Sequence, residues 1–296
     1  MDEEYKIIMK IRDILSKKQP TLSFEVFPPK KDSDYSKVEE ATIKIARLKP
    51  AFMSITYGAG GGTSKHTVDI AAKLKNSCGV TPLAHLTCAS STKEEVAIQL
   101  GKLKEQGIEN ILALRGDRIA GKEIAGADEY QYASELVQAI RNFGDFSIGA
   151  ACYPEGHVEA ANRKEDIIHL KEKVDAGCDF LTTQMFFDNN ILYNYLYQLR
   201  EAGINVPVIA GIMPVTNPSQ IKRICELSGT VLPQRFKAIV EKFGDNKEAM
   251  EQAGIAYATD QIIDLFANGV NAVHVYSMNK PEVASSIYNN ISKIIR

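Results

Sequence analysis

Eight short apolar segments alternate with helical segments along this 296-residue chain, and the alternation predicts an α/β fold, a (β/α)8 TIM barrel. The apolar segments are hydrophobic along almost their whole length, which is typical of parallel strands covered on both faces. Polar residues follow nearly every one of them, where a barrel carries its active site. A doubly wound open sheet is the alternative, which the absence of a dinucleotide fingerprint disfavours.

The composition favours a single domain over residues 1–296 and a small-molecule ligand. Its 45% hydrophobic content allows a large core, and no linker or repeat divides the chain. A net charge of −2 without a block of Lys and Arg argues against nucleic-acid or anionic membrane partners. We expect neither a signal peptide nor membrane insertion, and therefore a cytoplasmic protein.

The cysteines are widely spaced and form no CxxC pair, so the sequence predicts no zinc or iron–sulfur site. We expect reduced, mostly buried thiols. The five are Cys78, Cys88, Cys152, Cys178 and Cys225.

The predicted elements begin with a helix over residues 3–16, which plugs or flanks the barrel. The stretch 22–29 forms the first strand and ends at two prolines, which cannot donate to a sheet ladder. The other strands are predicted over residues 51–57, 82–87, 110–114, 147–151, 180–185, 208–212 and 272–276. The alternating helices are predicted over residues 35–48, 65–76, 93–106, 130–142, 163–176, 191–202 and 283–295.

Two segments depart from this alternation. Residues 218–268 are expected to form consecutive helical pieces, divided at Pro233 and Gly254, and so a helical insertion before strand 8. The glycine run 58–62 lacks the spacing of a phosphate-binding fingerprint, so a flexible strand-to-helix turn is the favoured interpretation.

Glu25 is a carboxylate inside an apolar strand. An ionised Glu is unfavourable in apolar surroundings unless it finds donors or takes up a proton. One interpretation is that Glu25 faces solvent or pairs with a Lys. The other is a general acid that carries a proton near neutral pH.

The predicted strand ends collect polar and aromatic side chains, but no spacing of a metal site, no nucleophile elbow and no strand lysine. We therefore expect a bound organic cofactor, to which the protein adds orientation, electrostatics and an acid. The residues at these ends are Glu25, Thr56, Tyr57, His85, Thr87, Arg115, Gly116, Asp117, Tyr153, His157, Gln184, Tyr276 and Ser277.

Several of these residues allow two interpretations. The Arg115–Asp117 turn is either a common polar turn or places a carboxylate at the edge of a dry pocket. His85 is either a hydrogen-bonded core residue or part of the site. Tyr153 and His157 either stack on a flat ligand or pack their loop. The residues alone predict a barrel enzyme with an organic cofactor and a Glu/Asp pair.

In six motifs, in order and spacing, the chain resembles the methylenetetrahydrofolate reductases, FAD-dependent barrel enzymes of one-carbon metabolism. The motifs are FEVFPP at 24–29, SITYGA at 54–59, AHLTC at 84–88, LALRGD at 112–117, YPEGH at 153–157 and TQMFFD at 183–188. The resemblance implies that FAD takes hydride from a reduced nicotinamide nucleotide and passes it to the methylene carbon, giving 5-methyltetrahydrofolate.

The same resemblance implies roles for individual residues. Glu25 is the expected general acid, and Asp117 is expected to tune the flavin and stabilise the iminium cation. Substrate contacts are expected from Gln184, Gln220, Lys280 and Asp117. FAD contacts are expected from Thr56, His85, Arg115, Gly116, Asp117, Tyr132, Ala133, Tyr153, His157, Asp166, His169 and Lys173.

The chain also departs from the family pattern. His169 and Glu172 stand where some members have Asn and Arg, Lys280 replaces an arginine, and Ile224 replaces an aromatic residue near the nicotinamide. The last two changes leave the electron donor open between NADH, NADPH and a partner protein. We expect a homo-oligomer or a hetero-oligomer with an electron-transfer or zinc-bearing subunit. A flavin-binding barrel without reductase activity is disfavoured by the presence of both carboxylates.

Overall fold

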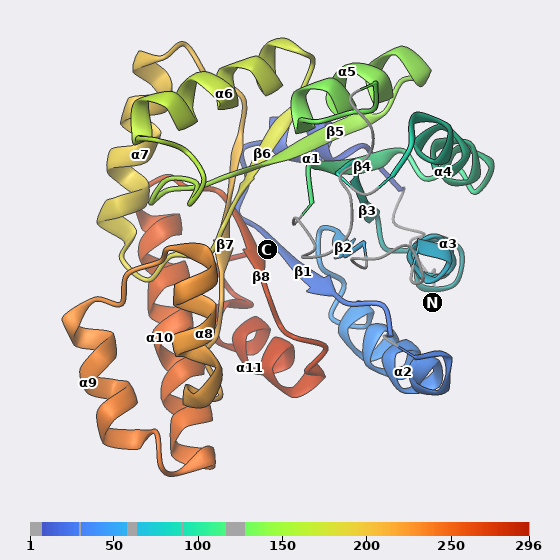
Figure 1. Ribbon diagram of the computed structural model, residues 1–296. Helices are drawn as coiled ribbons and strands as arrows, with labels where there is room; N and C mark the ends of the chain where they lie inside the picture. Colours follow the sequence, from blue (N-terminus) through green and yellow to red (C-terminus); the bar gives the residue numbers. More distant parts are fainter. Residues whose placement is uncertain (1–7, 30, 58–63, 90, 117–127, 296) are drawn as a thin grey trace.

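The computed structural model describes residues 8–29, 31–57, 64–89, 91–116 and 128–295. Eight parallel strands close into a barrel in the order β1 to β8, which confirms the predicted (β/α)8 fold (Figure 1). The strands are β1 (Thr21–Val26), β2 (Met53–Ile55), β3 (Pro82–Thr87), β4 (Asn110–Leu114), β5 (Ser147–Cys152), β6 (Phe180–Thr183), β7 (Val208–Ile212) and β8 (Ala272–Val275).

The helices surround the strands in Figure 1. They are α1 (Ile11–Ser16), α2 (Tyr35–Ala46), α3 (Ser64–Cys78), α4 (Lys93–Glu105), α5 (Ala133–Phe143), α6 (Arg163–Asp175), α7 (Asn189–Glu201), α8 (Pro218–Ser228), α9 (Gln234–Phe243), α10 (Lys247–Ala267) and α11 (Pro281–Ile291), with a 3-10 turn at Asp32–Asp34. Three strands match their predicted bounds, whereas the prediction of 51–57 and 180–185 as strands was too long. The glycine run 58–62 lies outside the described residues.

Alternate residues of each strand face different layers, because successive side chains point to opposite faces of a sheet. In β1, Leu22, Phe24 and Val26 belong to the large core between strands and helices. Ser23 and Glu25 face the barrel interior, where they lie beside residues of β8 and β2. The interior is therefore built from every second strand residue.

Helix α1 closes the N-terminal end of the barrel. Its Ile11 and Leu15 pack against inward-facing apolar residues of the strands, which confirms a plug and not a flanking helix. These strand residues are Leu83, Leu112, Phe180, Ile209 and Ala272, together with Phe52 just before β2. The prediction of a helix from residue 3 was wrong for residues 8–10, which are not helical.

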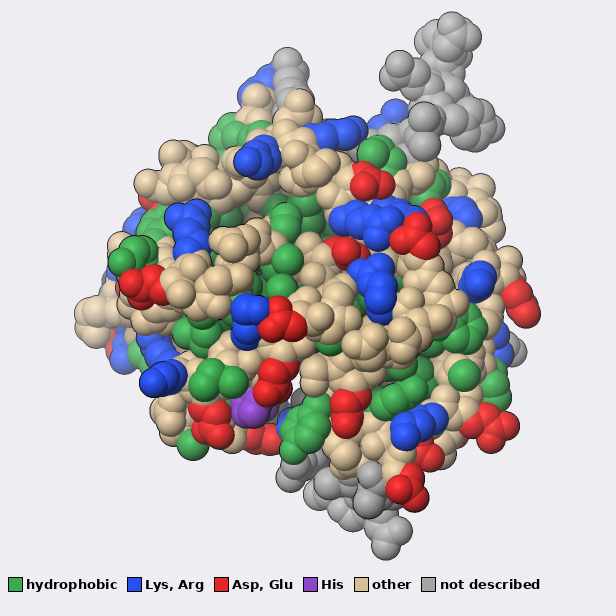
Figure 2. Space-filling model, turned by 90° about the horizontal axis from the view of Figure 1, so that it is seen from above, with side chains coloured by type: hydrophobic (Ala, Val, Ile, Leu, Met, Phe, Trp, Pro, Cys, Tyr) green, Lys and Arg blue, Asp and Glu red, His purple; other side chains and the backbone are tan. Residues whose placement is uncertain are grey.

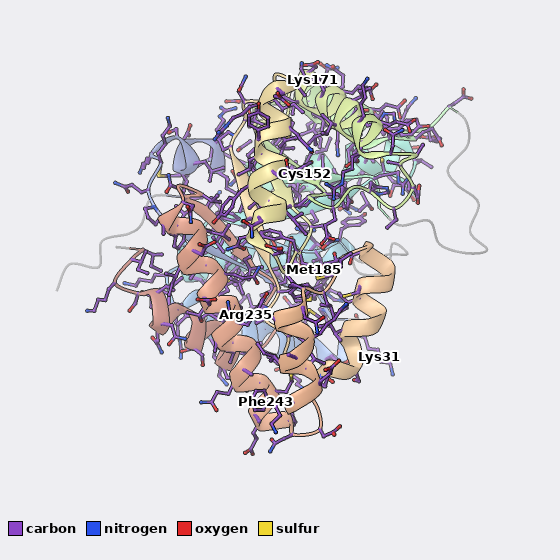
Figure 3. All side chains as sticks on the ribbon, turned by 90° about the vertical axis from the view of Figure 1, so that its left-hand side faces the viewer. Lys31, Cys152, Lys171, Met185, Arg235 and Phe243 are labelled. Atoms are coloured by element: carbon purple, nitrogen blue, oxygen red, sulfur yellow. The ribbon has the colours of Figure 1, made fainter. Side chains whose placement is uncertain are left out.

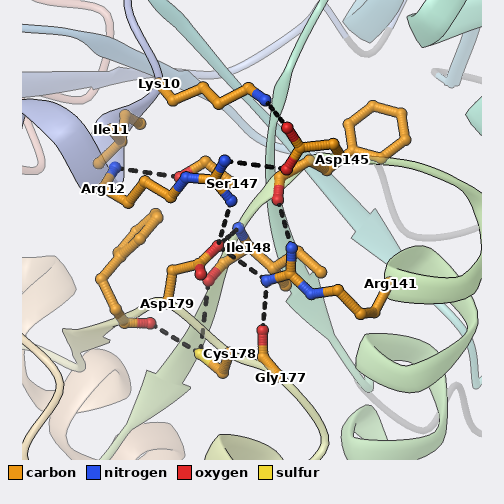
Figure 4. A network of polar contacts seen from close by, with 12 residues as sticks. Lys10, Ile11, Arg12, Arg141, Asp145, Ser147, Ile148, Gly177, Cys178 and Asp179 are labelled. Carbon is orange, nitrogen blue, oxygen red and sulfur yellow. Dashed lines mark hydrogen bonds and ion pairs between the residues drawn. The ribbon is translucent and has the colours of Figure 1, made fainter.

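Polar contacts fix the plug to its neighbours (Figure 4). Lys10 Nζ and Arg12 Nη2 donate to the two oxygens of Asp145, at 2.5 and 2.9 Å. Arg141 Nη2 donates to Asp179 Oδ2 at 2.9 Å, and Arg12 Nη1 lies 3.9 Å from the same oxygen. The N-terminal end is thus closed by apolar packing inside and ion pairs outside.

The helical insertion is α8, α9 and α10, which project at the lower left of Figure 1. Figure 3 views the molecule from that side and labels Arg235 and Phe243 near the two ends of α9. The expected division at Gly254 was wrong, because this residue lies inside α10. A Cβ there would lie 1.9 Å from the carbonyl oxygen of Val215, so glycine lets α10 pack directly against the segment after β7.

The surface carries mixed charge. On the face shown in Figure 2, basic and acidic side chains are interspersed among apolar and polar ones. Among the described residues, no helix combines the length and the apolar character needed to cross a membrane. All five cysteines are free, and three of them, Cys88, Cys152 and Cys178, are buried.

Candidate active site

A cavity of about 720 Å³ opens at the C-terminal ends of the strands. This volume lies in the range of sites that bind cofactors and small molecules. Thirteen residues with an expected catalytic or binding role line it: Glu25, Thr56, His85, Arg115, Gly116, Tyr132, Ala133, Tyr153, His157, Asp166, His169, Lys173 and Gln184. Residues far apart in the sequence thus meet at one place because all eight strands point the same way.

Three of the residues with an expected catalytic or binding role are not placed at the cavity. Asp117 lies outside the described residues. Gln220 lies on α8, and its side chain is also outside what the structure describes. Lys280 does not line the cavity, and its Nζ donates to Thr216 Oγ1 at 2.6 Å. Their substrate contacts stay predictions.

Glu25 lies at the floor of the cavity, where it is only 6% exposed. The interpretation that it faces solvent or pairs with a Lys was wrong: the ionisable groups within 4 Å of its Oε2, among the described residues, are the imidazoles of His85 and His274. Ser54 Oγ lies 3.3 Å from Glu25 Oε2, because the β1–β2 register pairs these two residues. Within the described part of the chain, the carboxyl group therefore has a hydroxyl partner and no Lys or Arg within 4 Å.

His274 extends this cluster. Its Nε2 lies 3.0 Å from Ser54 Oγ and its Nδ1 lies 2.7 Å from Ser23 Oγ. The imidazole stacks on the ring of Phe52, with ring centroids 5.7 Å apart and planes nearly parallel, and meets the ring of Tyr276 edge-to-face. A ring held in this way keeps one nitrogen toward each serine.

His85 is neutral over the physiological range. Burial lowers its pKa to about 4, against an opposing effect of Glu25, whose Oε2 lies 3.6 Å from His85 Nε2. That distance is too long for a hydrogen bond. The Nε2 atom is buried and has no hydrogen-bond partner among the described residues, so it is available to a ligand in the cavity.

The rim of the cavity is charged and aromatic. Arg115 donates two hydrogen bonds to Glu159, at 2.6 and 2.9 Å. The rings of Tyr153 and His157 meet edge-to-face with centroids 4.6 Å apart, and both also line the cavity. The two interpretations of this pair are therefore compatible, since the rings pack on each other and still face the space.

Two ionisable groups of the cavity lining lie on α6, the buried Asp166 and the half-buried Lys173. Lys173 Nζ donates to the carbonyl oxygen of Ala151 at 2.7 Å, and burial lowers the pKa of this amine. Burial raises the pKa of the Asp166 carboxyl, which the nearby Lys173 partly offsets. Burial also lowers the pKa of His157, and Arg115 adds to this effect.

The residues present fit an organic cofactor such as FAD. Two buried polar atoms at the cavity, His85 Nε2 and Thr182 Oγ1, lack partners among the described residues and offer hydrogen bonds to a flat heterocycle. Basic side chains of Arg115 and Lys173 suit a negatively charged diphosphate. Within the described ranges, no group of three or more His, Cys, Asp or Glu side chains could hold a metal ion.

Sequence reasoning missed the residues behind Glu25. Ser23, Ser54, Thr182 and His274 are buried polar residues of apolar strands, and none was assigned a role. Alternation along each strand is the signal that could have found them, because Ser23 shares the inward face with Glu25, and His274 shares it with Tyr276.

Comparison with known proteins identifies the family. The family model described as methylenetetrahydrofolate reductase matches residues 10–292. The 5,10-methylenetetrahydrofolate reductase of Escherichia coli (strain K12) is 34% identical over 273 residues, covering 92% of this chain and 91% of that protein. Methylenetetrahydrofolate reductase (NADH) 1 of Arabidopsis thaliana is 34% identical over 302 residues, covering 98% of this chain. The chain spans 51% of the plant protein, about half its length.

Solved structures support the barrel. An uncharacterized protein from Clostridium thermocellum, which binds two copies of 5-methyl-5,6,7,8-tetrahydrofolic acid, superposes with a TM-score of 0.65 at 15% identity, covering 96% of this chain and 99% of that one. Oxaloacetate acetylhydrolase superposes with a TM-score of 0.58 at 14% identity, covering 96% and 85%. At such identities the likeness concerns the fold alone. The match over residues 10–292 and the near full-length bacterial relative show that this chain belongs to the methylenetetrahydrofolate reductase family, a family of oxidoreductases.

Proposed function

We propose that this chain reduces 5,10-methylenetetrahydrofolate to 5-methyltetrahydrofolate with a non-covalently bound FAD. The observation that carries the proposal is that the expected acid, Glu25, shares one cavity with eleven of the twelve expected FAD contacts, the twelfth being Asp117. Twelve residues taken at random from the chain would not be gathered at one barrel end. The family match supports the same reaction.

The chain's own residues would hold the cofactor. Tyr153 and His157 offer ring surfaces, His85 and Thr182 offer unused polar atoms, and Arg115 supplies positive charge. When bound, FAD accepts hydride from a reduced nicotinamide and donates hydride to the folate. The protein orients both partners at one cavity and excludes bulk water from its floor.

Glu25 is the acid of this proposal. Opening the imidazolidine ring of the folate requires a proton on the departing nitrogen, and Glu25 lies at the floor of the cavity where it can deliver one. Gln184 lines the same cavity and is the proposed amide contact to the folate. By family resemblance, Asp117 would stabilise the cation that ring opening forms.

The proposed electron donor is NADH, since plant relatives carry NADH in their names. The expected oligomer or partner subunit stays a prediction.

The test uses the purified protein and three observations. Its chromophore should be released by denaturation and migrate as FAD. Anaerobic NADH should bleach the flavin within seconds, and 5,10-methylenetetrahydrofolate should then restore the colour and yield 5-methyltetrahydrofolate. A colourless protein that fails to take up FAD contradicts the proposal. If neither NADH nor NADPH bleaches the flavin, but 5,10-methylenetetrahydrofolate restores the colour of chemically reduced protein, another electron donor serves the site.

A further inference from the structure

Four polar contacts run in series from Glu25 through the barrel interior. Ser54 Oγ lies 3.3 Å from Glu25 Oε2 and 3.0 Å from His274 Nε2. On the other side of the imidazole, Ser23 Oγ lies 2.7 Å from His274 Nδ1 and 3.1 Å from the carbonyl oxygen of Val273. The four side chains are at most 6% exposed, so water does not compete for these contacts.

The orientation of the imidazole follows from these contacts. Both ring nitrogens face a serine hydroxyl, and a ring turned over would place carbon atoms there. Phe52 and Tyr276 pack against the ring and restrict its rotation. The positions of the hydrogens can therefore be derived by counting donors and acceptors.

Each of the four contacts needs one hydrogen. The carbonyl oxygen of Val273 only accepts, so the single hydroxyl hydrogen of Ser23 is directed to it. Nδ1 of His274 must then carry a hydrogen and donate it to Ser23. This leaves the two contacts of Ser54 to be satisfied.

Two arrangements satisfy them. In the first, His274 is neutral, its Nε2 accepts the Ser54 hydroxyl hydrogen, and a protonated Glu25 donates to Ser54. In the second, His274 is doubly protonated, Nε2 donates to Ser54, and Ser54 donates to an ionised Glu25. An ionised Glu25 beside a neutral His274 leaves one contact without a hydrogen, which is costly inside a protein.

We propose that Glu25, Ser54 and His274 hold one proton in common, and that Ser54 and His274 are positioning residues that keep it available for transfer from Glu25 to substrate. The inference rests on the proposed function, in which Glu25 is the acid. It adds a role for two residues that do not react with the substrate themselves.

The proton moves between the two arrangements without a co-reactant. From His274 to Glu25, the Nε2–H bond breaks as a new Ser54 Oγ–H bond forms, and the former Ser54 O–H bond breaks as Glu25 Oε2–H forms. The transfer converts the ion pair of His274 and Glu25 into two neutral groups. His85 cannot substitute for His274, because it makes no hydrogen bond to Glu25 and stays neutral.

The first test needs no substrate. Nitrogen-15 NMR of histidine-labelled protein distinguishes the two neutral tautomers from the doubly protonated ring, and the chain has only five histidines. We expect a hydrogen on Nδ1 of His274 in the unmodified protein. In Glu25→Gln the amide donates to Ser54 as a protonated Glu does, so His274 should be neutral with its hydrogen on Nδ1.

The signal is assigned by its loss in His274→Asn or, if that variant does not fold, by substituting the other four histidines in turn. A neutral His274 that carries its hydrogen on Nε2 in the unmodified protein overturns the proposal. So does a His274 in Glu25→Gln that is doubly protonated.

The second test compares Ser54→Thr with Ser54→Val, which have the same shape and differ in the hydroxyl group. Transfer to folate should be at least about tenfold slower in the Val variant than in the Thr variant, as expected when proton delivery is impaired. Flavin reduction by NADH should be equal in the two. Equal folate rates overturn the proposal. Should neither variant fold, the NMR result on the unmodified protein decides. A protein that makes no 5-methyltetrahydrofolate would refute the proposed function, whereas the NMR result would still test the shared proton.

Discussion

The inward-facing strand residues differ between the two ends of this barrel. At the N-terminal end, inward residues such as Leu83 and Phe180 are apolar and belong to the cluster that includes α1, which closes the barrel, and Leu83 also forms part of the cavity lining. Two residues further along the same strands, His85 and Thr182 line an open cavity and have buried polar atoms without partners. Apolar packing and unpartnered polar atoms are therefore separated along the barrel axis, so substitutions at the two ends should have separable effects on stability and on ligand binding.

The largest effect on stability should come from Phe180→Ala at the closed end. Phe180 is fully buried, and its ring occupies the space beside Gly149, where a Cβ would lie 2.4 Å from it. Loss of the ring should lower the free energy of unfolding by about 3–5 kcal/mol through lost burial and a cavity. Urea unfolding measures this. The affinity of the folded variant for FAD should be unchanged, and a selective loss of FAD binding at intact stability would contradict the separation.

A second effect depends on pH and concerns His85 at the open end. Its pKa is about 4 in the folded protein against an ordinary value of 6.5, so the unfolded chain takes up a proton first as pH falls. Stability should therefore be complete above pH 6.5 and decline toward pH 4, by on the order of 3 kcal/mol for this group.

His85→Gln removes this titration. The free energy of unfolding is measured for the flavin-free protein and the flavin-free variant between pH 6.5 and pH 4. The unmodified protein should lose more stability than the variant as the pH falls through this window. Parallel pH curves would show that His85 is not buried as a neutral group.

A smaller effect on stability is expected from Thr182→Val, which changes the inward residue two positions after Phe180 on the same strand. Valine keeps the shape and removes a buried hydroxyl that lacks a partner. The free energy of unfolding of the flavin-free protein should stay constant or rise by about 1 kcal/mol, because an unsatisfied buried group is removed. Binding of FAD or folate, measured by titration calorimetry, should weaken. A large loss of stability would mean that the hydroxyl has a structural role.

The smallest effect should come from Asp145→Asn outside the closed end. Hydrogen bonds from Lys10 and then Arg12 lower the pKa of the Asp145 carboxyl to about 2. A depressed pKa contributes stability above the ordinary value near 3.8, and the contribution is lost as pH falls toward 2. Because Asp145 is exposed, the melting temperature should fall only slightly at pH 6, and this difference should shrink as the pH approaches 3. A difference that is independent of pH would contradict the ion-pair origin.

Much of the fold could be predicted from local sequence. Runs such as 82–87 and 208–212 are apolar with clear ends, and both match the observed strands. Gly254 misled the prediction because a glycine usually marks a break, whereas here its missing Cβ permits close packing of α10 on Val215. Such a requirement depends on a partner 39 residues away and is not visible locally.

The candidate site was predictable where a residue stands at a strand end or belongs to a family motif, as Glu25 and His85 do inside their strands, and not where its role depends on a neighbouring strand. His157 and Gln184 stand at strand ends and were identified. His274 was missed, because its significance depends on the β1–β8 register that brings it beside Ser23. The first and last strands become neighbours only when the barrel closes. The sequence of one strand therefore does not show which residues of the other it will face.

The most direct test of the account is the effect of Glu25→Gln on the two half-reactions, followed separately by stopped-flow. The substitution keeps a hydrogen-bond donor toward Ser54 but removes the transferable proton, so oxidation of the reduced flavin by 5,10-methylenetetrahydrofolate should slow by about 10²–10⁴-fold. Flavin reduction by NADH should remain within a few-fold of normal, and the urea midpoint should hold, since no unpaired charge is buried. An equal loss in both half-reactions, or no loss in either, would contradict the assignment of Glu25 as the acid.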